Sequence, residues 1–166
     1  IFAYIDKIAL FRGQWQYKQG SLSDDDYLRQ IADEVEPLLK RWCEMAKDEE
    51  VLQPKLVYGY FPVGSEGNDL IVFDPIDHDR EVERFTFPRQ QGRRRLCIAD
   101  FFRPSSSTGG AEHVRDVLGL FCVTMGPEAS VRTRELFAAN RYTDYLHLHG
   151  LSVSAAEGLA ELWHQR

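Results

Sequence analysis

The sequence contains no long hydrophobic run and has few basic residues. No stretch approaches the ~20 consecutive apolar residues that span a bilayer, and none has the form of a secretory signal peptide. Its 20 Lys and Arg against 26 Asp and Glu give a formal net charge of −6. Binding to the phosphates of a nucleic acid requires an excess of cations on one surface. The composition therefore argues against a membrane protein and against a nucleic-acid-binding protein.

Cysteine is also scarce. The three cysteines, Cys43, Cys97 and Cys122, are odd in number, and no two of them form a C-x-x-C pair. Neither a zinc knuckle nor a disulfide framework is indicated. Each cysteine lies among apolar neighbours, so we expect three buried, reduced thiols in a cytoplasmic protein. The one dense basic run, three arginines at 93–95, fits a solvated hairpin tip better than a phosphate site.

The pattern of apolar residues indicates two helical segments around a β-rich middle. Ser23 begins a helix whose apolar residues keep helical spacing to about Lys47, with an acidic residue placed as in a capping box. Pro37 lacks a backbone donor, so the helix either kinks there or restarts with Pro37 in its first turn. Pro127 begins a last helical region, from about Glu128 to the end. Between them lie β-rich runs: "KLVYGYFPV", "NDLIVFD", "VERFTFPRQ", "RLCIADFF" and, after the flexible connection "RPSSSTGGAEH", "DVLGLFCVTMG".

The order helix, strands, helix shows no repeats and no regular βαβ alternation. It predicts an α+β fold in which helices flank an antiparallel sheet. A chain of 166 residues with 43% hydrophobic side chains suits one domain. We divide that domain into an N-terminal helical region (1–50), antiparallel strands (55–126) and a long helix (127–166). The chain begins without methionine and stops within a helical pattern, so we expect a piece of a longer protein.

The closing segment, "YTDYLHLHGLSVSAAEGLAELWHQR", holds three of the five histidines. On a helix His147 and His149 point about 200° apart, and they could not chelate one metal ion as a pair four residues apart could. His149 shares an apolar stripe of this helix, so we expect it to be a packed core or boundary residue. His164 and His113 supply no obvious third ligand. No metal site is predicted.

The same helix carries a strip of small residues. Gly150, Ser154 and Gly158 recur every four residues, and each glycine inside a helix costs on the order of 1 kcal/mol relative to alanine. A neighbouring segment or a ligand must therefore use the bare backbone. Glu157 and Glu161 border the strip one turn apart. From the residues alone they are either solvated surface glutamates or, for Glu157, a carboxylate beside a groove.

Asp6 stands out near the start of the chain. It follows Tyr4 and Ile5 in an aromatic-rich stretch, where a carboxylate is costly unless it has a partner. One such role is the N-cap of a short helix that starts at Lys7. A binding role is equally compatible with the residues.

Together these residues resemble the activation domain of cobalamin (vitamin B12)-dependent methionine synthase, in its N-terminal portion. The segment "HGLSVSAAEGLAELWHQR" is similar to the family's long helix, which reads close to H-G-L-S-V-x-x-A-E-x-L-A-E-x-W-H-x-R. Three more segments agree in order: "YIDKIALF" at the start, "PRQQ" at 88–91 and "LCIADFF" at 96–102. "LQPKLVYGYFPVGSEGNDLIVF" resembles the family's segment with a G-x-F-P strand end. The similarity spans nearly the whole chain.

The resemblance implies an α+β domain around a twisted antiparallel sheet, within a modular 5-methyltetrahydrofolate–homocysteine S-methyltransferase. Such a domain positions S-adenosyl-L-methionine, the methyl donor, for reductive methylation of cob(II)alamin to methylcobalamin. The chemistry occurs at the cobalt, so no catalytic residue is expected in this chain. The implied partners are the cobalamin-binding domain of the same polypeptide, which holds the cobalamin, and flavodoxin or a flavodoxin-like reductase. Zinc would belong only to the homocysteine domain of the full enzyme.

At the matching positions, the resemblance implies roles for three carboxylates. Asp6 would accept from the amino group of S-adenosylmethionine, and Glu157 would lie near its sulfonium, where a negative charge is favourable. Glu128 would be a contact with the cobalamin domain. The family's Arg-x-x-x-Gly-Tyr segment comes after this helix and is absent from the sequence. We therefore expect at most half of the binding site here, and no activity of this chain alone.

Two other functions remain compatible with the sequence. The chain could be an interaction module that docks on the cobalamin-binding domain without a competent S-adenosylmethionine site. It could also be a stand-alone S-adenosylmethionine-binding protein. An Arg-x-x-x-Gly-Tyr-Pro continuation after Arg166 would favour the enzyme module over the interaction module. A cobalamin module with a D-x-H-x-x-G motif before Ile1 would exclude the stand-alone protein.

Overall fold

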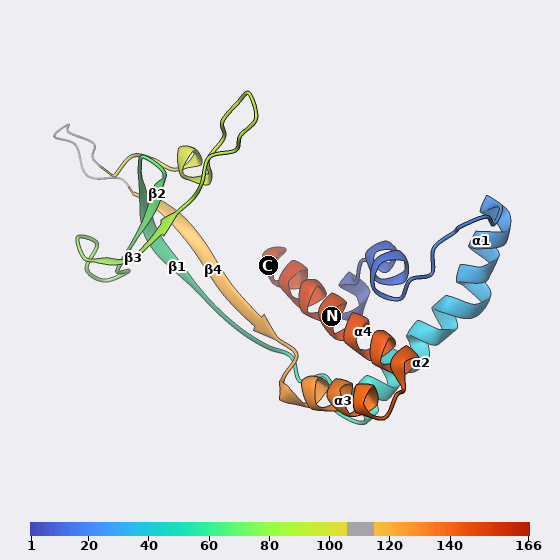
Figure 1. Ribbon diagram of the computed structural model, residues 1–166. Coiled ribbons are helices and arrows are strands. Elements are labelled where there is room, and N and C mark those ends of the chain that lie inside the picture. The colour runs from blue at the N-terminus through green and yellow to red at the C-terminus, as the bar shows by residue number, and fades with distance from the viewer. Residues whose placement is uncertain (106–114) are drawn as a thin grey trace. The chain divides into compact units, whose positions relative to one another are not determined.

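The computed structural model describes residues 1–105 and 115–166 and divides into two compact units (Figure 1). The helical unit comprises Ile1–Val57 and Cys122–Arg166, and the sheet unit comprises Tyr58–Phe121. The first and last segments of the chain therefore belong to the same unit. The order of helices, strands and helices confirms the predicted α+β fold. Within the described ranges, no helix is both long enough and apolar enough to cross a membrane.

Two short helical turns begin the chain. A 3-10 helix spans Phe2–Tyr4, and a π-helix spans Ala9–Gln14. In the second turn Leu10 and Phe11 are buried, at 0% and 4% exposure. Both belong to the main apolar cluster of the helical unit, which also contains Leu151 from the last helix. The aromatic-rich start of the chain is therefore part of a core.

A long, interrupted helix follows, and it begins as predicted at Ser23. The Ser23 hydroxyl oxygen accepts from the backbone N–H three residues on, at 3.1 Å, and caps α1 (Asp24–Gln30). A π-helical turn, Ile31–Val35, leads into α2 (Glu36–Asp48), which has Pro37 in its first turn. Because proline has no N–H to donate to the preceding turn, α2 restarts there. This is the second of the two outcomes predicted for Pro37.

The sheet has the strand order β3-β2-β1-β4, and its β1–β2 and β2–β3 pairs are antiparallel. A tight turn at Gly67, whose φ is +59°, joins β1 to β2 and pairs Glu66 with Asp69. The strands are β1 (Lys55–Glu66), β2 (Asp69–Phe73), β3 (Glu81–Thr86) and β4 (Asp116–Thr124). The buried centre of this unit consists of Val63, Leu70 and Val72, with partly buried Phe61, Phe87, Phe102 and Leu118 around it.

One predicted strand is absent. The segment "RLCIADFF" forms a 3-10 helix over Ile98–Phe101 instead. The Asp100 carboxylate accepts from the backbone N–H of Cys97 at 3.2 Å, which closes the turn. The Arg89 guanidinium donates to the same carboxylate at 2.7 and 2.6 Å and holds the pKa of Asp100 below its usual range. This local side-chain bonding competes with the ladder hydrogen bonds of a strand, and it prevails here.

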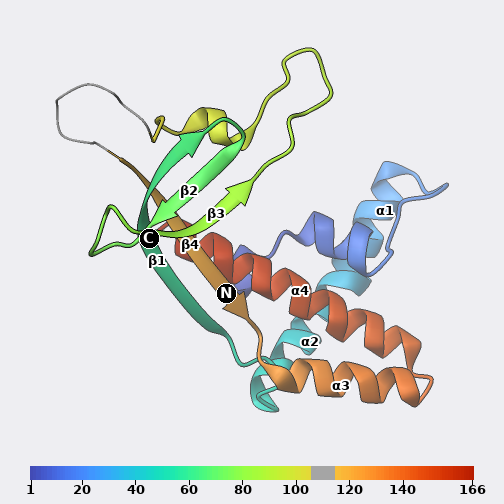
Figure 2. The ribbon, with the colours of Figure 1, turned by 60° about the vertical axis from the view of Figure 1, so that its left-hand side comes forward.

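The single long helix expected over 127–166 is divided in two. Helix α3 spans Pro127–Ala138, and helix α4 spans Tyr142–His164. Asn140 between them has a φ of +58°, a left-handed conformation that ends a helix and that asparagine tolerates better than most residues. Helix α4 contacts α2, α3 and both N-terminal helical turns (Figure 2). It is therefore the central element of the helical unit.

The cysteines and the arginine run are placed in different environments. Cys97 is buried and Cys43 is half-buried, where burial raises the pKa of its thiol to about 11. Cys122 is exposed, so the expectation of three buried thiols is wrong for this residue. Cys122 is exposed because it lies on β4, an edge strand with many exposed residues. The arginines at 93–95 are exposed in a turn, as predicted, but a 3-10 helix and not a strand follows them, so the predicted hairpin is absent. Most of the connection "RPSSSTGGAEH" lies outside the described residues.

Candidate functional site

The small-residue strip of α4 is covered by the N-terminal segment. A Cβ atom at Gly158 would lie 3.3 Å from the backbone of Tyr4. A Cβ atom at Gly150 would lie 2.8 Å from Cβ of Gln14 and 2.9 Å from the ring of Trp15. At Gly150 these distances leave no room for a side chain, and at Gly158 a Cβ atom would require the Tyr4 backbone to shift by a few tenths of an ångström. Of the two uses predicted for the bare backbone, close packing of a neighbouring segment is the one observed.

Tyr4 and Trp15 line this contact but are not among the site residues predicted above. The only signal for them in the sequence is the density of aromatic residues near the start of the chain. Trp15 also donates from Nε1 to the carbonyl oxygen of His147 at 3.0 Å, which ties the segment to α4 a second time. Both anchors position the residues that lie between them, including Asp6.

Asp6 is exposed and follows the contact with Gly158 by two residues along the chain. Its Oδ1 accepts from the backbone N–H of Ile8 at 2.9 Å and of Ala9 at 3.0 Å. Asp6 is therefore the N-cap that was predicted as one of its two roles. Among the described residues no further hydrogen bond reaches this carboxylate, so its Oδ2 is available to a cation.

Replacing Asp6 with alanine should lower the free energy of unfolding by about 1 kcal/mol, because two backbone N–H groups lose their acceptor. Asparagine caps helices as well as aspartate does, so Asp6→Asn should leave stability nearly unchanged. Urea unfolding measures both variants. An equal loss in the two would mean that the charge of Asp6, and not its cap, stabilises this turn.

The other two predicted carboxylates lie on different helices. Glu157 is exposed on α4 and immediately precedes Gly158, at the edge of the contact with Tyr4. Glu128 is exposed in the first turn of α3, where the helix dipole favours a negative charge. The structure thus brings together the segments that carry Asp6 and Glu157. It places Glu128 on a separate element.

The two histidines near the middle of α4 point to different sides, as predicted, but the expectation that His149 is packed is wrong. His149 is exposed and stacks on Tyr145, with ring centroids 5.5 Å apart, whereas His147 is only 7% exposed. The covered face of α4 includes Leu151 and Ser154, and His147 shares that face because it lies four and seven residues before them. Its ring is surrounded by those of Trp15, Trp42 and Tyr17, at centroid distances of 4.8, 5.8 and 6.4 Å.

No group of three or more metal-ligating side chains occurs in residues 1–105 and 115–166. His113 lies outside these described residues.

Burial lowers the pKa of His147 below its ordinary value, and nearby Asp144 opposes the shift. The unfolded chain therefore binds this proton more readily than the folded one. The free energy of unfolding therefore has its full value above about pH 6.5, the ordinary pKa of histidine. It decreases as the pH falls below that value. We expect the midpoint of urea unfolding to drop between about pH 7.5 and about pH 5.5. His147→Phe, which keeps an aromatic ring in place, should reduce that drop.

His149→Phe is the matched control for this pH dependence, because its ring is exposed on the same helix. It should retain the full drop in the midpoint. If His147→Phe also retained it, the pH dependence would come from other groups.

Two features define a class of α+β domain. The sequence of the sheet unit is inserted within that of the helical unit, and the first residues pack on the glycine strip of the last helix. The crystal structure of the MetH reactivation domain bound to AdoHcy shares this fold, with a TM-score of 0.74 and 24% identity over 98% of this chain and 50% of that chain. The model of the family described as vitamin B12 dependent methionine synthase, activation domain, matches residues 1–166. The chain belongs to this family.

Two curated relatives carry the name methionine synthase. The protein from Mycobacterium tuberculosis (strain ATCC 25618 / H37Rv) is 42% identical over 165 residues, and the protein from Mycobacterium leprae (strain TN) is 41% identical over 167 residues. Each match covers 98% of this chain and 14% of the relative. The chain therefore corresponds to one segment of these much longer proteins.

Proposed function

We propose that this chain is part of the reactivation module of a B12-dependent methionine synthase. In that module it positions S-adenosyl-L-methionine for the reductive methylation of cob(II)alamin to methylcobalamin. Family membership and the two methionine synthase relatives support the methyltransferase. The AdoHcy bound to the reactivation domain of similar fold supports an adenosyl ligand. The observation that carries the proposal is the packing of Tyr4 on Gly158, because it joins the segments that hold Asp6 and Glu157.

The charges of the two carboxylates complement those of the ligand. S-adenosylmethionine carries two cations, an ammonium and a sulfonium. Asp6 accepts from the ammonium through the carboxylate oxygen that the N-cap does not use. Glu157 stands beside the sulfonium and stabilises its positive charge. The chain supplies position and charge, and the methyl transfer itself takes place at the cobalt of the neighbouring domain.

The proposed partners follow from this role. The cobalamin-binding domain of the same polypeptide docks on this domain, with Glu128 at the interface, and flavodoxin or a flavodoxin-like reductase supplies the electron that the reaction consumes. Glu128 suits an interface because it is exposed, and its helix begins in that turn.

The complete protein that contains this sequence provides the test. After oxidation to cob(II)alamin, its absorbance spectrum should change to that of methylcobalamin when S-adenosylmethionine and a one-electron reductant are both present. Omitting either should prevent the change. A protein that holds cobalamin but does not bind S-adenosylmethionine in equilibrium dialysis would instead support the docking module described above.

A further inference from the structure

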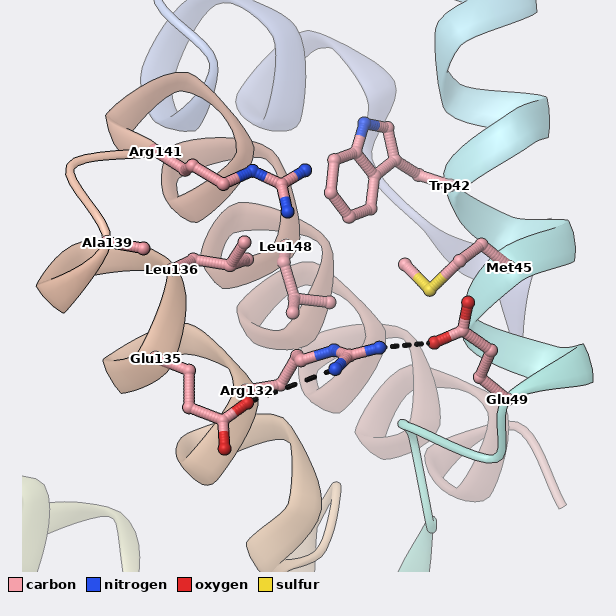
Figure 3. Close-up of a pocket in the computed structure, with 9 residues that line it drawn as sticks. All are labelled: Trp42, Met45, Glu49, Arg132, Glu135, Leu136, Ala139, Arg141 and Leu148. Atoms are coloured by element: carbon pink, nitrogen blue, oxygen red, sulfur yellow. Dashed lines mark hydrogen bonds and ion pairs between the residues drawn. The ribbon is translucent and has the colours of Figure 1, made fainter.

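The helical unit contains a cavity of about 350 Å³ whose lining includes none of Asp6, Glu128 and Glu157 (Figure 3). It lies between α2, α3 and α4. Its volume falls at the lower end of the range for small-molecule sites, about 300–1,000 Å³. The cavity is therefore separate from the proposed S-adenosylmethionine site and large enough for a small ligand.

The floor of the cavity is apolar. Leu148 of α4 is 0% exposed, and Leu136 of α3 is 8% exposed. Trp42 and Met45 of α2 pack against the same cluster and form the opposite wall (Figure 3). An indole ring and a thioether accept aliphatic and aromatic groups of varied shape. This floor suits the apolar part of a ligand.

The mouth of the cavity carries two guanidinium groups and two carboxylates. Arg132 of α3 donates to Glu49, just after α2, at 2.6 Å and so bridges two walls (Figure 3). Glu135 lies 3.9 Å from Arg132, beyond hydrogen-bond distance, so its carboxylate can accept from another cation. Arg141, in the connection before α4, is held by Asp144 through Nε at 2.9 Å and Nη2 at 2.8 Å. Its Nη1 has no partner among the described residues.

These charges discriminate between classes of ligand. Arg132 is paired with Glu49, and Arg141 is paired with Asp144 through Nε and Nη2. The groups left for a ligand are therefore Nη1 of Arg141 and the carboxylate of Glu135. A simple anion would be attracted by the first and repelled by the second, and a simple cation would meet the reverse. A zwitterion with an apolar tail satisfies both signs at once. We propose that this pocket binds a free α-amino acid with an apolar side chain. Its carboxylate pairs with Arg141, its ammonium pairs with Glu135, and its side chain lies on the apolar floor.

Calorimetric titration of the complete protein that contains this sequence with L-leucine tests the proposal. We expect saturable binding with a dissociation constant below about 1 mM. Two probes keep the tail of leucine but remove one charge each: 4-methylpentanoate lacks the ammonium, and 3-methylbutylamine lacks the carboxylate. Each should bind at least about tenfold more weakly than leucine, because one charged pair is lost.

Variants of the rim locate the binding. Arg141→Gln and Glu135→Gln should each weaken leucine binding about tenfold. Arg134→Gln, at an exposed arginine of α3 that does not line the cavity, should not. Ala139→Phe leaves all four charges in place but puts a ring at the mouth, and it should abolish binding. The proposal would be overturned by no leucine binding, by equal affinity for the three probes, or by unchanged affinity in both Arg141→Gln and Glu135→Gln.

Discussion

Replacing Glu157 with glutamine should weaken the binding of S-adenosylmethionine to the complete protein about tenfold, with S-adenosylhomocysteine nearly unaffected. The two ligands differ in one charge, because the sulfonium of the first is a cation and the thioether of the second is neutral. A carboxylate beside the sulfonium therefore attracts only the first ligand. A tenfold change corresponds to ~1.4 kcal/mol, which is within the range of one charge pair near a protein surface.

Replacing Asp6 with asparagine completes this experiment. Both ligands carry the same ammonium, so Asp6→Asn should weaken both, by about tenfold or more. Asparagine keeps the helix cap, so the loss would not come from unfolding of the turn. Glu161→Gln, one turn further along α4 and also exposed, should change neither affinity. If calorimetry showed that Glu157→Gln weakened the two ligands alike, Glu157 would not be the neighbour of the sulfonium.

Replacing Gly150 with valine should lower the free energy of unfolding by about 3 kcal/mol, the upper end of typical overpacking costs. A Cβ atom alone would lie 2.9 Å from the ring of Trp15, and that ring is 5% exposed and hydrogen-bonded to the carbonyl of His147. The ring cannot move aside without losing this burial and this hydrogen bond. Removing a helical glycine gains at most ~1 kcal/mol of helix propensity. The clash costs more than this, so we expect Gly150→Val to be destabilising.

Gly13→Ala is the control for this substitution. Gly13 lies in the π-helix Ala9–Gln14, and its added Cβ would have no atom within 4 Å apart from its chain neighbours and the backbone of its own helix. This variant should be as stable as the original or gain up to about 1 kcal/mol. Urea unfolding compares the two, and the affinity of the complete protein for S-adenosylmethionine should fall in Gly150→Val alone. Full stability of Gly150→Val would mean that the N-terminal segment does not pack on α4 in solution.

Local rules predicted the features that depend on a few neighbouring backbone groups. The cap at Ser23 and the restart of the helix at Pro37 are of this kind, since one side-chain oxygen or one missing N–H decides each. The segment "RLCIADFF" was assigned wrongly because the Arg89–Asp100 ion pair, between residues eleven apart, favours a turn. The break at Asn140 was missed because a helical spacing of apolar residues continues across it.

The candidate site was less accessible to such rules. The spacing of Gly150, Ser154 and Gly158 showed that something approaches α4, but the approaching residues lie at the other end of the chain. The burial of His147 rather than His149 depends on the same distant packing. The residues alone placed Glu157 beside a possible groove but left it equally compatible with a solvated surface glutamate, and only the family resemblance decided between the two roles.

The packing of the first residues on the last helix has a consequence for synthesis on the ribosome. The sheet unit, Tyr58–Phe121, is continuous in sequence and can pair its strands before α4 is made. Trp15 must wait for His147, which is made 132 residues later. Until α4 emerges, the apolar side chains of the N-terminal segment are covered only in part, by residues such as Leu39 and Ala46 of α2, and the nascent chain is most prone to aggregate in that interval. Within this domain, residues that are made early are thus among the last to be buried.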